Sequence, residues 1–148
     1  GMSSRLFQKI REELGLAYSV YSYSSQYKDN GVIEIYAGVN TSLRDLAVNA
    51  IMEQIKILKQ NGITEQEFLR GKEQVKSAFI MGQESTSSQM LLYAKYLAIL
   101  DKEFDINERI KRLDKVTIKD VNEVIERTFD LSTLATATVG SKRTPLKI

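Results

Sequence analysis

Residues Met2–Tyr23 read MSSRLFQKIREELGLAYSVYSY, and within this stretch a helical pattern stops at a glycine and a strand pattern begins at once. Before the glycine, apolar side chains recur at helical spacing, at Leu6, Phe7, Ile10 and Leu14. Gly15 can take a left-handed conformation without steric cost, so we expect it to end the helix in a sharp turn. From Ala17 the period is two, which predicts a strand with Tyr18 and Val20 on the same face.

Arg11 and Tyr18 lie on opposite sides of this predicted turn and can therefore be close in space. A guanidinium and a phenol that both donate hydrogen bonds could together hold a carbonyl oxygen that gains negative charge. On residue types alone, the more common arrangement is an arginine solvated on a helix face and a tyrosine half buried in a strand. The pair is nevertheless the candidate site of this chain.

The rest of the chain predicts one more hairpin strand and a series of helices. The Asn30-Gly31 pair is a hairpin signal, and the following VIEIYAGV alternates as a strand covered on one side. Apolar stripes and capping residues then predict helices over about 42–61, 64–82, 90–100, 105–113 and 117–129, and 134–139 is expected to close the chain as a strand. The segment 90–100 is apolar almost all round, so we expect it to be the most buried helix. Its Tyr93 and Tyr96 are interpreted as core and rim residues rather than as a ligand-stacking pair.

These elements predict an α+β fold, with a small antiparallel or mixed sheet covered on one face by a layer of helices. We expect a single domain over 1–148, in which residues 141–148 form a disordered tail. Three strands are fewer than such a helical layer usually covers. Amino-terminal strands are therefore expected to be missing, which leaves a sheet edge exposed and favours self-association as a homo-oligomer.

Composition excludes several classes of function. The 148 residues carry 21 Lys and Arg against 19 Asp and Glu, and the two signs are interspersed, which argues against a nucleic-acid surface. The chain has no cysteine, so it forms no disulfide and no thiolate metal site, and it suits the reducing cytoplasm, where we expect it. Its most apolar segment, 90–100, is too short to span a membrane.

The stretch SRLFQKIREELGLAYS resembles the carboxy-terminal, non-metal-binding half of the zinc peptidases related to pitrilysin, insulin-degrading enzyme and mitochondrial processing peptidase. The resemblance implies the fold of one metallopeptidase half, and it implies that residues belonging before Gly1 are absent. The chain would then be a cut piece, or an open reading frame that starts at Met2 behind a leftover tag glycine. The family's catalytic half carries an H-x-x-E-H zinc motif, whereas this chain has no histidine. Zinc is therefore expected in the complete enzyme and not in this chain.

In this family, the second half contributes an arginine and a tyrosine that reach the substrate near the zinc, and Arg11 and Tyr18 match those positions. The resemblance thus implies the substrate-binding carboxy-terminal part of a zinc-dependent metallopeptidase, inactive by itself. Its expected partners are a peptide substrate and the metal-binding half or a partner subunit. The alternative is a non-catalytic partner or structural subunit of the same fold. An H-x-x-E-H motif upstream, or in a neighbouring gene's product, would favour the enzyme.

Overall fold

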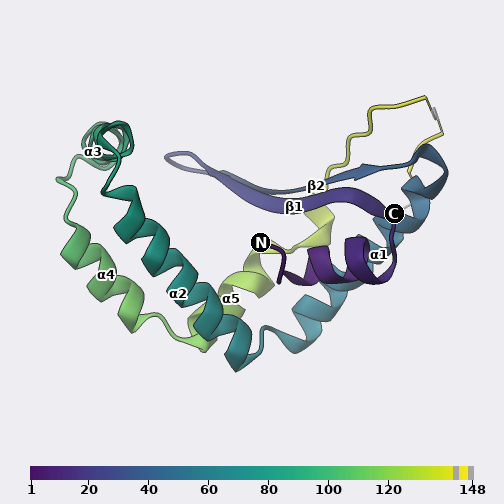
Figure 1. Cartoon of the computed structure of the whole chain (residues 1–148), viewed down its shortest axis with the longest axis horizontal. Coiled ribbons are helices and arrows are strands. Elements are labelled where there is room, and N and C mark those ends of the chain that lie inside the picture. The colour runs from purple at the N-terminus through teal and green to yellow at the C-terminus, as the bar shows by residue number, and fades with distance from the viewer. Residues whose placement is uncertain (142–143, 147–148) are drawn as a thin grey trace. The chain divides into compact units, whose positions relative to one another are not determined.

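The computed structural model describes residues 1–141 and 144–146, which divide into two compact units. Unit 1 comprises Gly1–Gly62 and the chain from Ile125 onward, and unit 2 comprises Ile63–Val124. Unit 1 holds the elements η1 (Phe7–Glu13), β1 (Ala17–Gln26), β2 (Gly31–Val39), η2 (Thr41–Leu43), α1 (Arg44–Asn61) and η3 (Leu131–Thr133). Unit 2 holds α2 (Glu65–Gly82), α3 (Thr86–Leu100) and α4 (Ile106–Lys115), and α5 (Ile118–Thr128) runs from unit 2 into unit 1 (Figure 1). The predicted α+β class is confirmed, while the single domain over 1–148 stays a prediction.

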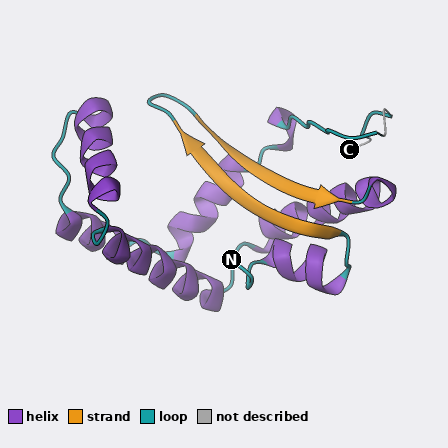
Figure 2. Cartoon of the chain, turned by 45° about the horizontal axis from the view of Figure 1, so that its top comes forward, coloured by secondary structure: helices purple, strands orange, loops and turns teal. Residues whose placement is uncertain are grey.

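The sheet of unit 1 is one long antiparallel hairpin of β1 and β2 (Figure 2). Its register pairs Gln26 with Gly31, and the amide of Tyr27 donates to the carbonyl of Asn30 at 2.9 Å. Neither Asn30 nor Gly31 takes a positive φ. The predicted hairpin is therefore confirmed, but its connection is a loop over residues 27–30 rather than a tight two-residue Asn-Gly turn.

The core of unit 1 lies on one face of the hairpin, where η1 and α1 pack (Figure 1). Ile10 of η1 is fully buried against Ala17 and Val20 of β1. Partly buried apolar residues surround these three, namely Leu6, Leu16, Ala37, Val39, Ala50 and Ile51. Two helices of unit 1 end next to a glycine with a positive φ. η1 is followed by Gly15 (+59°), as the sequence predicts, and α1 by Gly62 (+65°).

The predicted closing strand over 134–139 is wrong, because this segment has no strand assignment and the described sheet contains β1 and β2 alone. Its alternating pattern is present, but both ends lie in solvent, with Leu134 42% and Val139 105% exposed. A strand needs a neighbour that takes its backbone hydrogen bonds, and a side-chain pattern cannot supply one. The expected disordered tail over 141–148 falls partly outside the described residues. Within it, Thr144 accepts a hydrogen bond at its carbonyl from the buried Arg44 at 2.9 Å.

The prediction that residues 90–100 form the most buried helix is also wrong. In α3, Met90, Leu91 and Leu97 are each more than 60% exposed. An all-round apolar pattern shows that a helix can be buried, but it does not say which surface covers it. The expected packing role of Tyr93 and Tyr96 is confirmed, because both rings pack edge-on against the buried Phe104, with centroids 5.5 and 5.0 Å away.

Unit 2 is held together by side chains that satisfy helix ends. The Lys72 ammonium of α2 donates to the carbonyls of Asp114 (2.7 Å) and Val116 (3.1 Å) where α4 ends. The Asn122 side chain of α5 accepts from the amide of Ile63 at 3.1 Å. These bonds join the carboxy-terminal end of α4 to α2, and the residue before α2 to α5, within the same unit.

The start of α5 carries a reciprocal cap that makes a pH-dependent contribution to stability. The amide and hydroxyl of Thr117 donate to the Asp120 carboxylate at 2.8 and 2.7 Å, and the Asp120 amide donates to the Thr117 hydroxyl at 3.3 Å. Hydrogen bonds from Thr117 lower the pKa of Asp120 below its ordinary value of 3.8. The carboxylate therefore stabilises the fold above about pH 4, and this contribution disappears as the pH falls through the lowered pKa.

We expect Thr117→Ala to lower the free energy of unfolding by about 1 kcal/mol, as for other lost helix caps. Asp120→Asn should lower the melting temperature more at pH 7 than at pH 2, because the stabilising carboxylate is lost as the pH falls through the lowered pKa of Asp120. Thermal melts of both variants at the two pH values measure this difference. An equal deficit for Asp120→Asn at both pH values would contradict the assignment.

Candidate functional site

Arg11 is positioned by a widened helical turn. Residues 7–13 form a π-helix, in which the amide of Leu14 donates to the carbonyl of Lys9 five residues back, at 3.1 Å. The amide of Leu16 then reaches the carbonyl of Ile10 at 2.9 Å across the positive φ of Gly15. Because Ile10 is buried in the core, its neighbour Arg11 leaves the helix toward solvent, where its side chain is 43% exposed.

The Arg11 guanidinium lies between two aromatic rings. Its carbon is 4.8 Å from the ring centroid of Phe7 and 5.9 Å from that of Tyr18, and its Nε is 3.7 Å from the Glu12 carboxylate. A guanidinium that contacts the face of an aromatic ring is restricted in position. The contact itself forms no hydrogen bond from the N–H groups of the guanidinium. Arg11 is thus oriented toward Tyr18, with its Nε beside the Glu12 carboxylate and its side chain partly open to solvent.

Tyr18 is the extra residue of a β-bulge. The register pairs Ala17 with Val39 and Ser19 with Gly38, which leaves Tyr18 without a partner of its own. Ala17 and Val20 both reach the core, whereas Tyr18 is 86% exposed. The prediction that Tyr18 shares a face with Val20 is therefore wrong, since the bulge interrupts the two-residue period between them.

The structure brings the two predicted site residues together at one end of the hairpin. Both side chains are open to solvent there in part, and a guanidinium and a phenol are each hydrogen-bond donors, a combination that could hold an oxygen with negative charge. The neighbouring Glu13 accepts from the Lys9 ammonium at 2.6 Å, and this hydrogen bond raises the pKa of Lys9. Glu13 is therefore held by a cation rather than directed at the pair.

The described part of the chain contains no group of three or more His, Cys, Asp or Glu side chains that could hold a metal ion. Zinc prefers histidine and thiolate ligands, and the sequence contains neither residue. The residues of this chain do not fit a zinc site. Among the described residues, no helix is both long and apolar enough to pass through a membrane.

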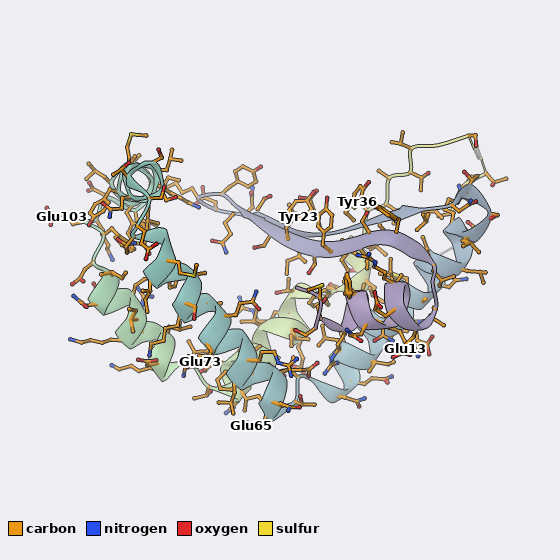
Figure 3. The ribbon with its side chains drawn as sticks, in the orientation of Figure 1. Glu13, Tyr23, Tyr36, Glu65, Glu73 and Glu103 are labelled. Carbon is orange, nitrogen blue, oxygen red and sulfur yellow. The ribbon has the colours of Figure 1, made fainter. Side chains whose placement is uncertain are left out.

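Sequence reasoning missed a group of tyrosines on the face of the hairpin that the helices leave open. Tyr21 stacks on Tyr36 across the strands with centroids 5.0 Å apart, and Tyr23 lies 6.0 Å from Tyr21. Tyr23 and Tyr36 rise from the side of the hairpin opposite to η1 and α1 (Figure 3). The alternation of tyrosine and serine in YSVYSYSS was the signal that could have identified this face.

Comparisons with known proteins place these features in a family. A zinc protease of Bacillus subtilis named YmxG, itself uncharacterized, is 41% identical over 86% of this chain, which spans 31% of that protein. An uncharacterized zinc protease of Streptomyces coelicolor is 34% identical over 84% of the chain and 27% of its own length. The chain thus spans about a third of the length of the curated relatives it matches.

A solved structure agrees on the fold. The inactive peptidase domain from a Bordetella parapertussis protein described as a zinc protease superposes with a TM-score of 0.76, at 16% identity, over 97% of this chain and 79% of that one. Residues 1–75, which include η1, the bulge and the hairpin, match the family model of the peptidase M16 inactive domain. The chain therefore belongs to the peptidase M16 inactive domain family, the non-catalytic carboxy-terminal domain of zinc proteases.

Proposed function

We propose that this chain is the substrate-binding part of a zinc-dependent metallopeptidase, in which Arg11 and Tyr18 bind the peptide main chain and stabilise the oxyanion. The observation that carries the proposal is the convergence of the two side chains, with the guanidinium carbon 5.9 Å from the phenol ring and both groups open to solvent. Their placement uses two local irregularities, a π-helix and a β-bulge, and such features often accompany functional sites.

The two groups suit an oxygen whose charge grows during the reaction. Arginine stays charged at any physiological pH and offers several donors, while the phenol offers one O–H. Donors fixed in advance stabilise developing charge without reorganising at the moment of reaction. The contacts of Arg11 with Phe7 and Tyr18 support such fixing, because they limit the positions of the guanidinium.

The hairpin also offers a way to hold an extended peptide. Within the described sheet, β1 and β2 pair only with each other, so each has one unpaired edge. An extended peptide can add to such an edge as a further strand, with main-chain hydrogen bonds that do not depend on its sequence. A peptide bound along the edge of β1 would pass the bulge and come within reach of Tyr18.

The metal that this activity needs would be bound by another part of the enzyme or by a partner subunit. The names of the relatives support a zinc protease, and the lack of histidine and cysteine supports a metal site outside these residues. When bound there, zinc would polarise the carbonyl of the peptide substrate and activate a water molecule, as it does in other hydrolases. This chain would bind the substrate and place its donors.

We expect the isolated chain to bind no stoichiometric zinc and to hydrolyse no peptide, because carboxylates alone select zinc poorly. The test is metal analysis after dialysis against zinc, followed by assay of a quenched fluorescent peptide with and without chelator. Adding the metal-binding part of the enzyme to the same sample is the positive control and should produce hydrolysis. One tightly bound zinc per isolated chain, or chelator-sensitive activity of the chain alone, would overturn the proposed division of roles.

A further inference from the structure

The open face of the hairpin is an aromatic surface. Its rings are those of Tyr21, Tyr23 and Tyr36, each about half exposed. Figure 3 shows Tyr23 and Tyr36 on the same side of the hairpin. Tyr21 and Tyr36 are register partners, and their rings stack at an interplanar angle of 24°. Stacked tyrosines restrict one another, so the surface can receive a ligand without first ordering its own side chains.

Gly38 connects this surface to the end of the hairpin where Arg11 and Tyr18 meet. A Cβ added at Gly38 would lie 2.8 Å from the hydroxyl oxygen of Ser19 and 3.6 Å from that of Tyr36. The Tyr36 ring therefore lies along the strand over Gly38, beside the bulge that carries Tyr18. A peptide held at Tyr18 could place a neighbouring side chain on Tyr36.

One acidic group lies within the aromatic surface. Glu34 is the register partner of Tyr23, so the two residues lie side by side on this face of the hairpin. Burial, and then the Glu34 carboxylate, raise the pKa of Tyr23, so the hydroxyl stays protonated and remains a donor. In the part of the chain that the structure describes, no lysine or arginine forms an ion pair with Glu34 or lies over the rings of Tyr21, Tyr23 or Tyr36.

We propose that this surface, formed by Tyr21, Tyr23, Glu34 and Tyr36, binds a lysine or arginine side chain of the peptide substrate. Electron-rich ring faces attract a basic side chain, and so does a carboxylate with which no described lysine or arginine forms an ion pair. The inference rests on the proposed function for its occupant, a peptide. Its location is fixed independently of Arg11, by the continuity of the tyrosines with the bulge.

The test compares two peptides that differ only in charge. The probes are Ac-Ala-Ala-Arg-Ala-Ala-NH2 and the same peptide with citrulline, which keeps the shape and most donors of arginine but is neutral. Each is titrated into the full 148-residue chain and followed by amide chemical shifts. We expect the arginine peptide to bind on the order of 10-fold more tightly, with its largest shifts on β1 and β2.

Matched variants locate the effect. Glu34→Gln keeps the shape of the side chain and should remove most of the difference between the two peptides, whereas Glu84→Gln, an exposed glutamate of unit 2, should leave it intact. Tyr36→Leu should weaken binding of the arginine peptide and serves as a second variant if Glu34→Gln folds poorly. Equal affinity for the two peptides, or an unchanged difference in Glu34→Gln, would overturn the proposal.

Two further measurements separate this inference from its alternatives. In Arg11→Ala the preference for arginine over citrulline should persist, so loss of the oxyanion role and loss of the basic-residue site are distinguishable. Light scattering of Tyr36→Glu beside the wild type tests whether a second copy of the chain covers this face. A wild-type dimer that this variant converts to monomer would assign the surface to self-association and overturn the proposal.

Discussion

Arg11→Ala and Tyr18→Phe, each introduced into the complete enzyme, are expected to lower kcat/KM on the order of 10²- to 10³-fold, or roughly 3 to 4 kcal/mol. In the proposed role, each variant removes hydrogen-bond donors from the place where the Arg11 guanidinium lies over the Tyr18 ring, next to Gly15 and the bulge. Charge that develops only in the transition state is sensitive to the loss of one fixed donor. The effect should therefore fall mainly on kcat. Kinetics, thermal melts and zinc content of each variant are the measurements.

The chain provides a matched control for each change. Arg70 is another exposed arginine, on α2, and Tyr27 is another exposed tyrosine, in the hairpin loop. Arg70→Ala and Tyr27→Phe should leave kcat/KM near the wild-type value and change stability by about 0.5 kcal/mol or less. Wild-type kinetics for both site variants would refute the clamp. A loss of activity matched by an equal loss of melting temperature would assign both residues to the scaffold.

Ile10→Ala is expected to lower the free energy of unfolding of unit 1 by about 2 to 4 kcal/mol. Ile10 is 0% exposed and lies at the centre of the small core that joins η1 to β1. Its removal leaves a cavity between them, which the few surrounding apolar side chains can fill only in part. Urea unfolding followed by tyrosine fluorescence reads this unit, because five of the seven tyrosines lie on the hairpin and its loop, at positions 18, 21, 23, 27 and 36.

Val32→Ala is the control for that measurement, since Val32 lies in the same hairpin and is 47% exposed. It should shift the urea midpoint much less than Ile10→Ala does. Equal shifts in the two variants would show that the cluster around Ile10 does not hold η1 on the hairpin.

The sequence predicted those parts of the fold that depend on local chemistry. The helix end at Gly15, the hairpin, and the capped starts of the helices predicted over 64–82 and 117–129 follow from conformational preference and short-range hydrogen bonds, and the structure confirms them. The two wrong predictions concern the exposed helix α3 and the segment 134–139. Burial of a helix and pairing of a strand both depend on neighbouring elements, which a periodic pattern cannot identify. In both cases the side-chain pattern is present, and the surface that it needs is not specified locally.

The candidate pair was predictable, but its geometry was not. The spacing of Arg11 and Tyr18 around a glycine indicated proximity, and the resemblance gave both residues a role. No residue type within 10–20 predicts a π-helix or a β-bulge. These irregularities arise because Ile10 and Val20, at the two ends of the segment, are both buried in the core. The alternation of tyrosine and serine in β1 could have predicted the open tyrosine face. The position of Glu34 beside these tyrosines, however, is known only from the cross-strand register.

The bulge at Tyr18 has a consequence for how this segment can vary among proteins. Ile10 and Val20 are both fixed in the core, so residues 11–19 form a connection of set length between two anchors. A deletion of one residue there would replace the bulge by a regular strand, or the π-helix by a regular α-helix, and would rotate Arg11 or Tyr18 away from the other. Substitution of an exposed side chain would not change this geometry. Insertions and deletions should therefore be rare between these anchors and common at the hairpin loop over 27–30, where an added residue displaces nothing in the core.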